Sequence, residues 1–223
     1  MLPNKNTKRA HRARGFSIVE AVTVITVASI LCAIAIPQMV AQRRLFRTSA
    51  ISREIMVQLR YARQMALARR MAYTFEYDNA TKQIRIIGPI PAGTAPLVDP
   101  TYPNLVGSSA IVTMPLTQSG LSRSEIVEGV PTTSTGLPAG SPTIPTGPLG
   151  DGVSRSSLTS GKFYVTFQPD GGVIDATGAP SDKALFFFNN KAAQDTATAV
   201  SVLGVSGRVK IWRYKTSGNA YAE

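Results

Sequence analysis

The most apolar part of the chain lies close to its N-terminus. Residues 21–36 carry no charge and are rich in Val, Ile and Ala. The wider stretch 16–41 is also mostly apolar and is interrupted only by Glu20 and Pro37. Because about 20 helical residues span a bilayer, this stretch predicts a membrane-spanning helix.

Residues 42–70 show a helical period instead. They contain no Gly or Pro, and Arg, Ala, Leu, Met and Gln dominate, which favours a helix. Apolar residues recur every three or four positions and predict one buried stripe, which we expect to pack against the protein's own sheet. The stripe consists of Ile51, Ile55, Leu59, Ala62 and Ala66. Arg53, Arg60, Arg63 and Arg70 lie off it. Since Pro37 is the only breaker, we expect one long helix over 16–70, softened near that proline.

After residue 70 the pattern changes to a period of two. Residues 73–77 alternate apolar and polar side chains, residues 78–81 are turn-forming, and residues 84–86 alternate again. This predicts a β-hairpin.

The rest of the chain predicts strands interrupted by a long irregular region. Residues 88–160 are rich in Pro, Gly, Ser and Thr, with a Pro/Gly-rich loop at about 129–150. Further strands are expected at 110–114, 163–167, 184–188, 199–203 and 208–214, a short element at 123–127 and a turn at 169–172. The domains are therefore expected to be 1–15, a leader; 16–41, the membrane helix; 42–70, its amphipathic continuation; and 71–223, a β-rich globular domain.

Charge and composition narrow the range of functions. The net charge of +11 resides in residues 1–70, because the acidic and basic residues of 71–223 balance. This distribution weakens the inference of nucleic-acid binding that a high pI would support. Cys32 is the single cysteine and His11 the single histidine, and neither falls in the β-rich part. A disulfide within the chain, a zinc site and a histidine-based catalytic triad are therefore not expected, and we expect neither an enzyme nor a cofactor.

The segment Arg14-Gly15-Phe16-Ser17-Ile18-Val19-Glu20 resembles the cleavage site of type IV prepilins. The resemblance implies cleavage by prepilin peptidase between Gly15 and Phe16, N-methylation of Phe16, and retention of the apolar helix. It also implies that Glu20 meets the N-terminal ammonium of a neighbouring subunit during assembly, and that Pro37 is the helix-softening proline common in pilins. A carboxylate within a membrane span raises the free energy of insertion by about 2.5–3.5 kcal/mol, and a positively charged partner would offset this cost.

Two further segments resemble the GspH/FimT family of pseudopilins and minor pilins. They are residues 59–66, in the helix, and Gly207-Arg208-Val209-Lys210 near the C-terminus. The resemblance implies an α+β pilin-like fold, with a long N-terminal helix whose second half packs on antiparallel strands. It implies a structural subunit of a type IV pilus or a type II secretion pseudopilus. The implied partners are other pilins or pseudopilins, the peptidase/methyltransferase and an assembly platform in the inner membrane, with the C-terminal domain in the periplasm.

Two other functions stay open. Some proteins of this family capture DNA for natural transformation through the C-terminal region, and Arg208, Lys210 and Arg213 are the candidate DNA contacts here. Strand alternation places Arg208 and Lys210 on one face with Trp212 and Tyr214. On such a face the cations can bind phosphates and the aromatic rings can stack on bases. The other alternative is a secreted non-pilin protein with an ordinary signal peptide, cleaved near residues 33–35.

A metal site is not expected. Asp170 and Asp175 flank two glycines, but calcium needs six to eight oxygen ligands, and two acids in a Pro-Asp-Gly-Gly segment are better explained as turn residues.

Overall fold

The computed structural model describes most of the chain. The described residues are 17–90, 110–116, 123–131, 156–159, 161–175, 177–215, 217 and 220–222. The chain divides into two compact units, Met1–Ala41 and Gln42–Glu223. The Gly15–Phe16 bond and most of the loop predicted at 129–150 lie outside the described residues.

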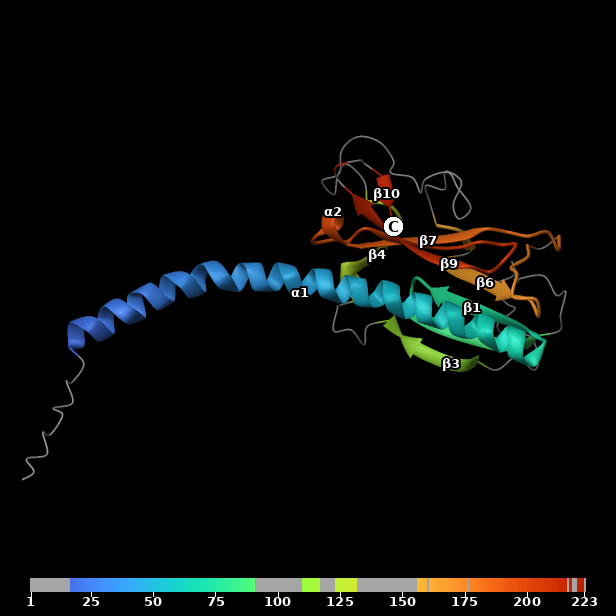
Figure 1. The fold of residues 1–223 in the computed structure, drawn as a ribbon, viewed down its shortest axis with the longest axis horizontal. Coiled ribbons are helices and arrows are strands. Elements are labelled where there is room, and N and C mark those ends of the chain that lie inside the picture. Colours follow the sequence, from blue (N-terminus) through green and yellow to red (C-terminus); the bar gives the residue numbers. More distant parts are fainter. Residues whose placement is uncertain are drawn as a thin grey trace, which may run out of the picture. The chain divides into compact units, whose positions relative to one another are not determined.

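A single helix, α1 (Ile18–Arg69), contains residues of both units (Figure 1). Pro37 lies inside this helix. Its first turn is closed by the amide of Ala21, which donates to the carbonyl oxygen of Ser17 at 3.0 Å. At its end, Arg70 takes a φ of 52°, the left-handed conformation that commonly terminates helices. The prediction of one helix through the proline is confirmed, with bounds about two residues inside the expected ones.

The first sheet holds the predicted hairpin. Strands β1 (Ala72–Asp78) and β2 (Gln83–Ile90) pair antiparallel, so the hairpin is confirmed. The carboxylate of Asp78 accepts the amide of Ala80 at 2.8 Å, the local bond that makes Asp a turn former. The five strands lie in the order β3-β2-β1-β6-β5. The remaining members are β3 (Ala110–Pro115), β5 (Leu158–Thr159) and β6 (Lys162–Phe167).

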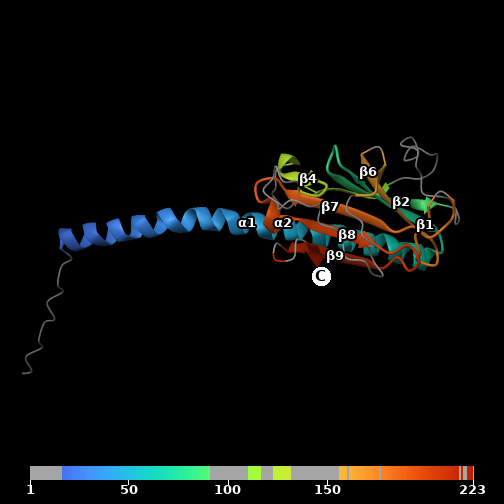
Figure 2. The same ribbon diagram turned by 90° about the horizontal axis from the view of Figure 1, so that it is seen from above.

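The second sheet has the order β10-β9-β8-β7-β4 and is also antiparallel. Figure 2 shows β7, β8 and β9 side by side. Its elements are η3 (Arg123–Glu125), β4 (Ile126–Glu128), β7 (Lys183–Asn189), the short helix α2 (Ala193–Thr196), β8 (Thr198–Val202), β9 (Val209–Lys215) and β10 (Ala220–Ala222). The expected strands are present. The sequence does not reveal β5, α2 and β10, because two to four residues are too few to show a period.

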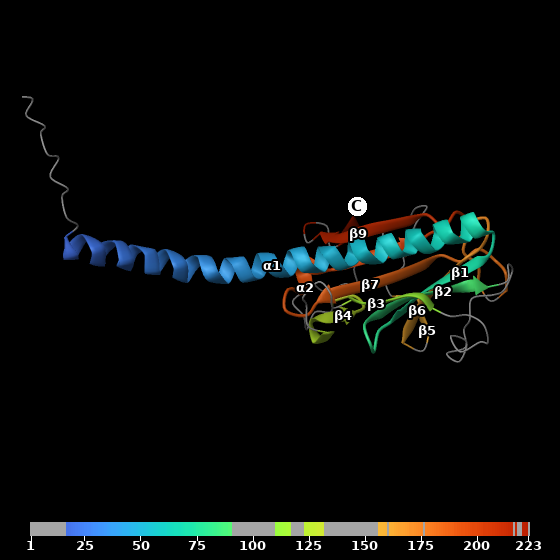
Figure 3. The same cartoon turned by 90° about the horizontal axis from the view of Figure 1, so that it is seen from below.

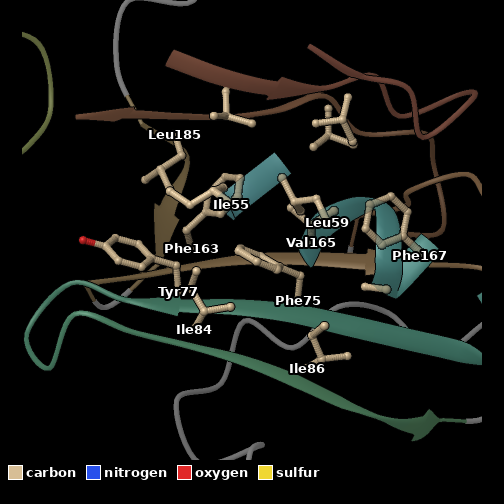
Figure 4. Packing of buried hydrophobic residues seen from close by; sticks show 14 of the residues in the cluster. Ile55, Leu59, Phe75, Tyr77, Ile84, Ile86, Phe163, Val165, Phe167 and Leu185 are labelled. Carbon is tan, nitrogen blue, oxygen red and sulfur yellow. The ribbon is translucent and has the colours of Figure 1, made fainter. Parts of the chain in front are cut away.

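The main core lies between the second half of α1 and one face of each sheet. The predicted stripe of α1 is buried, with Leu59, Ala62 and Ala66 fully enclosed. Phe75 and Phe163 meet edge to face, with their ring centroids 6.3 Å apart (Figure 4). The stripe therefore packs on the protein's own strands, and the α+β architecture with a long N-terminal helix on antiparallel sheets is confirmed.

A smaller cluster covers the opposite face of the second sheet. Phe186, Trp212, Tyr214 and Tyr221 belong to it, and α2 closes part of it. Both faces of β9 are thus partly covered, one by the core beneath α1 and the other by this cluster.

The outer face of the first sheet buries a charge. Glu76, which is fully enclosed, forms an ion pair with Arg85 of the neighbouring strand, and Lys162 lies 3.6 Å from the same carboxylate oxygen. A buried carboxylate needs such partners because desolvation penalises its charge.

Candidate functional site

The first half of α1 places its apolar side chains in the open. Large apolar side chains are exposed along this half, from Ile18, which is 84% exposed, to Met39, which is 59% exposed. Among the described residues α1 is the one helix long and apolar enough to cross a membrane, and its most apolar window is entirely exposed. A signal sequence near the N-terminus has the same composition, so this observation alone does not separate the two.

The residues predicted for assembly lie within this half. Glu20 occupies the first turn of α1 with an exposed side chain, and its carbonyl oxygen accepts the hydroxyl of Thr23 at 2.9 Å. Pro37 is also exposed. Gly15 and Phe16, the predicted processing site, precede the described residues. Their roles stay predictions.

The second half of α1 runs beside β9 (Figure 3). Together with the turn before β9, these two elements line a groove. The helix contributes Met56, Arg60, Arg63 and Gln64, and the turn and strand contribute residues 206–211. The groove has a volume of about 670 Å³. It brings Arg208 and Lys210, the predicted cationic pair, together with two arginines of the helix.

Glycines allow the turn before β9 to lie close to its neighbours. Gly207 has a φ of 61°, and a Cβ there would lie 1.9 Å from the carbonyl oxygen of Gly171. The same carbonyl oxygen accepts the Nε of Arg63 at 3.3 Å. Gly207 therefore fixes the turn against the 169–172 segment and the helix, which places Arg208 at the mouth of the groove.

The predicted arrangement of side chains along β9 is present only in part. The ammonium of Lys210 lies 4.8 Å from the ring centroid of Trp212, so these two share a face. Arg208 precedes β9, because the strand begins at Val209. Arg213 does not line this groove. It lines a second hollow of about 330 Å³, together with Leu45, Phe46, Arg53 and Asp195 among others.

The aromatic residues beside the cations are not open to a ligand. Trp212 is 7% exposed and Tyr214 is 8% exposed. The indole Nε1 of Trp212 donates to the hydroxyl of Ser201 at 2.8 Å, and Tyr214 packs edge to face on Tyr221. The aromatic rings that were predicted to stack on bases are therefore buried in the smaller hydrophobic cluster.

Sequence reasoning missed two residues of the groove. The sequence places Arg60 and Arg63 off the buried stripe of the helix and identifies no partner for them. Their spacing of three predicts a common face, but the sequence does not reveal that β9 lies beside that face. Only the tertiary structure makes four cations line one groove: Arg60, Arg63, Arg208 and Lys210.

The two aspartates considered for calcium serve local turns. The Oδ1 of Asp170 accepts the amide of Gly172 at 2.8 Å. The Oδ1 of Asp175 accepts the amide of Thr177 at 2.8 Å and the hydroxyl of the same residue at 2.6 Å. These bonds hold the pKa of Asp175 below its ordinary value, which marks a turn-forming carboxylate. Within the described ranges, no three His, Cys, Asp or Glu side chains gather as a metal site would require.

Comparison with known proteins gave few matches. No family model matches the sequence, and no curated protein matches it. Two crystal structures of the type IV minor pilin FimU from Pseudomonas aeruginosa (strain PAO1) are similar in structure. One, in space group P65, has 15% sequence identity and a TM-score of 0.40, and the match covers 76% of this chain and 94% of that one. The other, in space group P21, has 16% identity and a TM-score of 0.40, with 80% and 94% covered.

Proposed function

We propose that this chain is a structural subunit of a type IV pilin-like filament, a minor pilin of a type IV pilus or a pseudopilin of a type II secretion system. The observation that carries the proposal is the contrast within α1. The second half buries its apolar stripe on the protein's own sheets, whereas the first half exposes its apolar residues from Ile18 to Met39. An apolar surface of that extent needs a bilayer or other protein to cover it.

The proposed sequence of events follows from the motif at residues 14–20. The chain is held in the inner membrane by residues 16–41, with the globular unit in the periplasm. Prepilin peptidase removes residues 1–15 after Gly15, and Phe16 is methylated. The apolar helix then leaves the bilayer for the filament, on the assembly platform, beside the same helices of other subunits. The chain carries out no reaction itself.

The role proposed for Glu20 is electrostatic docking. Its carboxylate is one turn from the new N-terminus, and it would pair with the free ammonium of an adjacent subunit. In an environment without water, an unpaired carboxylate is costly and a paired one much less so. The pair would set the axial register between subunits.

The decisive experiment is mass spectrometry of the mature N-terminus from the native host. We expect a chain that starts at Phe16 and carries one added methyl group. A chain that starts near Ile36 would identify an ordinary signal peptide and a secreted non-pilin protein, and would overturn the proposal.

A second experiment addresses docking separately. Glu20→Gln removes the charge, and we expect the variant to reach the membrane but to be lost from sheared filaments. Glu54→Gln is the matched control, because Glu54 lies on the same helix and its carboxylate accepts the Nε2 of Gln58 at 2.8 Å, a bond within the helix. Equal incorporation of both variants would show that the docking role is wrong.

DNA capture through phosphate contacts alone is a second candidate function, because four cations line the groove. Duplex or single-stranded DNA held there would contact Arg208 and Lys210, with Arg60 and Arg63 opposite. We expect the double substitution of Arg208 and Lys210 by Ala to abolish a gel shift, whereas Arg213→Ala, in the other hollow, should retain it. An unchanged shift in the double variant would remove this groove from DNA binding.

A further inference from the structure

The groove beside β9 exposes backbone as well as cations. It is lined by residues 206–208 of the turn and by Val209, Lys210 and Ile211, consecutive residues of β9 that belong to alternate faces of the strand. A groove that only faced one side of a strand would be lined by every second residue. This groove therefore reaches the edge of β9.

That edge is open along half of the strand. On one side β8 pairs with β9 from Val209 to Arg213, and on the other β10 pairs only with Arg213–Lys215. Among the residues that the structure describes, no strand pairs with Val209–Trp212 on the β10 side. An open edge presents a row of backbone donors and acceptors that another strand can use.

The direction of these backbone groups follows from two bonds on the β8 side. The amide of Tyr214 donates to the carbonyl oxygen of Ala197 at 3.0 Å, and the carbonyl oxygen of Arg208 accepts the amide of Leu203 at 2.9 Å. Even-numbered residues thus point their backbone groups toward β8. Because the direction alternates along an antiparallel strand, Val209 and Ile211 point theirs toward the open side.

The side chains around the open edge are cationic and apolar. Arg60 and Arg208 are exposed, Lys210 lies beside them, and Met56 and Ile211 provide partly buried apolar contacts. Like charges along an edge oppose pairing between two copies of the same chain. They favour a strand with carboxylates at alternate positions, because opposite charges across an interface select the partner.

We propose that this edge is a docking site for an extended acidic segment of another protein, which adds to the second sheet as a strand beside residues 209–212 of β9. The segment's backbone pairs with Val209 and Ile211. Its carboxylates, on one face, meet Arg208 and Lys210, and its apolar side chains, on the other face, rest on Met56 and Ile211. Arg60 adds to the positive charge at the groove. Main-chain bonds supply affinity in this mode of recognition, and the side chains supply specificity. The inference goes beyond filament assembly and does not depend on it.

The structure favours a peptide over nucleic acid at this place. Base stacking needs open aromatic rings, whereas Trp212 and Tyr214 are buried. The phosphates of a nucleic acid could accept the open amides of Val209 and Ile211 but could not donate to their carbonyl oxygens, whereas a strand pairs with both.

The test is fluorescence anisotropy with the full chain in detergent micelles and a labelled peptide of about six residues, the usual length of a strand, that alternates glutamate and valine. We expect saturable binding. The same peptide with N-methylated backbone amides keeps its charge but cannot pair along an edge, and we expect it to bind about tenfold more weakly or worse. Equal binding of the two peptides would show attraction by charge alone and overturn the proposal.

Variants locate the site. Arg208→Ala combined with Lys210→Ala should weaken binding of the acidic peptide about tenfold. Arg53→Ala combined with Arg69→Ala, an equal loss of two charges on α1 and outside the groove, should not. In hydrogen exchange, bound peptide should slow the amides of Val209 and Ile211 and leave that of Trp212 unchanged. Unchanged exchange at Val209 and Ile211, or a single-stranded DNA oligomer that binds where the peptide does not, would overturn the proposal.

Discussion

The two halves of α1 are built from similar aliphatic residues but place them in opposite surroundings. Leu31, in the first half, is 62% exposed, whereas Leu59, in the second half, is fully buried against both sheets. The second half also has arginines on its outer face, and the first half from residue 21 to 36 has no charge at all. The fold of this chain therefore uses only one half of the helix.

The difference shows where the stabilising contacts of each half come from. Burial of apolar surface contributes about 25 cal/mol per Å² wherever the cover is found. For the second half the cover is in the same chain. For the first half it must be a lipid phase or other protein, which is why the anchor and the filament core are functions of the same residues in our proposal.

The largest expected effect is the difference in unfolding free energy between substitutions of Leu59 and Leu31. Leu59→Ala leaves a cavity in the core and should lower the free energy of unfolding of the globular unit by about 2–5 kcal/mol. Leu31→Ala, on the same helix, should leave it unchanged within about 0.5 kcal/mol. Denaturant titration of the full chain in detergent measures both. A comparable loss in the two variants would mean that the first half also packs within its own chain.

A carboxylate introduced into α1 should impair membrane insertion when it lies in the first half but not when it lies in the second. Ile30→Asp places a carboxylate in the apolar half and should raise the free energy of membrane insertion by about 3–4 kcal/mol. Val57→Asp lies on the exposed face of the second half, where 52% of the side chain is already exposed, and should not change insertion. The fraction of each variant that stays in membranes after alkaline extraction checks this. Equal retention of both would contradict membrane insertion of the first half.

The sequence predicts the elements of this fold better than it predicts their contacts. The helix, the hairpin and the strands of the C-terminal third follow from period and turn residues, because these are local properties. The groove does not, because Arg60 and Arg208 are 148 positions apart in the numbering, and only packing brings α1 beside β9. The burial of Trp212 could not be predicted either, because strand alternation predicts which face a side chain is on but not which residues cover that face.

The turn that supports the groove should be nearly as sensitive as the core. Gly207→Ala combines a left-handed backbone with a Cβ 1.9 Å from the carbonyl oxygen of Gly171, and we expect a loss of about 2–4 kcal/mol. Gly178→Ala is the matched control: its φ is 84°, but nothing lies within 4 Å of the added Cβ. It should lose only about 1 kcal/mol. Thermal unfolding of both variants measures the difference, and equal losses would show that the close approach at Gly207 has no effect on stability.

The smallest effect concerns two arginines on the outer face of the second half of α1. Arg63 donates its Nε to the carbonyl oxygen of Gly171 at 3.3 Å and so ties the helix to the 169–172 turn. Arg63→Met should therefore cost about 1 kcal/mol of unfolding free energy, because one hydrogen bond is lost. Arg60→Met, one turn earlier and exposed, should change it by less than about 0.5 kcal/mol.

Ligand binding should rank these two variants in the opposite order. Arg60 is the more exposed of the pair at the groove and has more of its charge available to an acidic peptide, whereas Arg63 is partly committed to the fold. We therefore expect Arg60→Met to weaken binding of the acidic peptide more than Arg63→Met does, when both are compared by fluorescence anisotropy. If the same arginine had the larger effect on both stability and peptide binding, the assignment of Arg63 to packing and of Arg60 to recognition would be wrong.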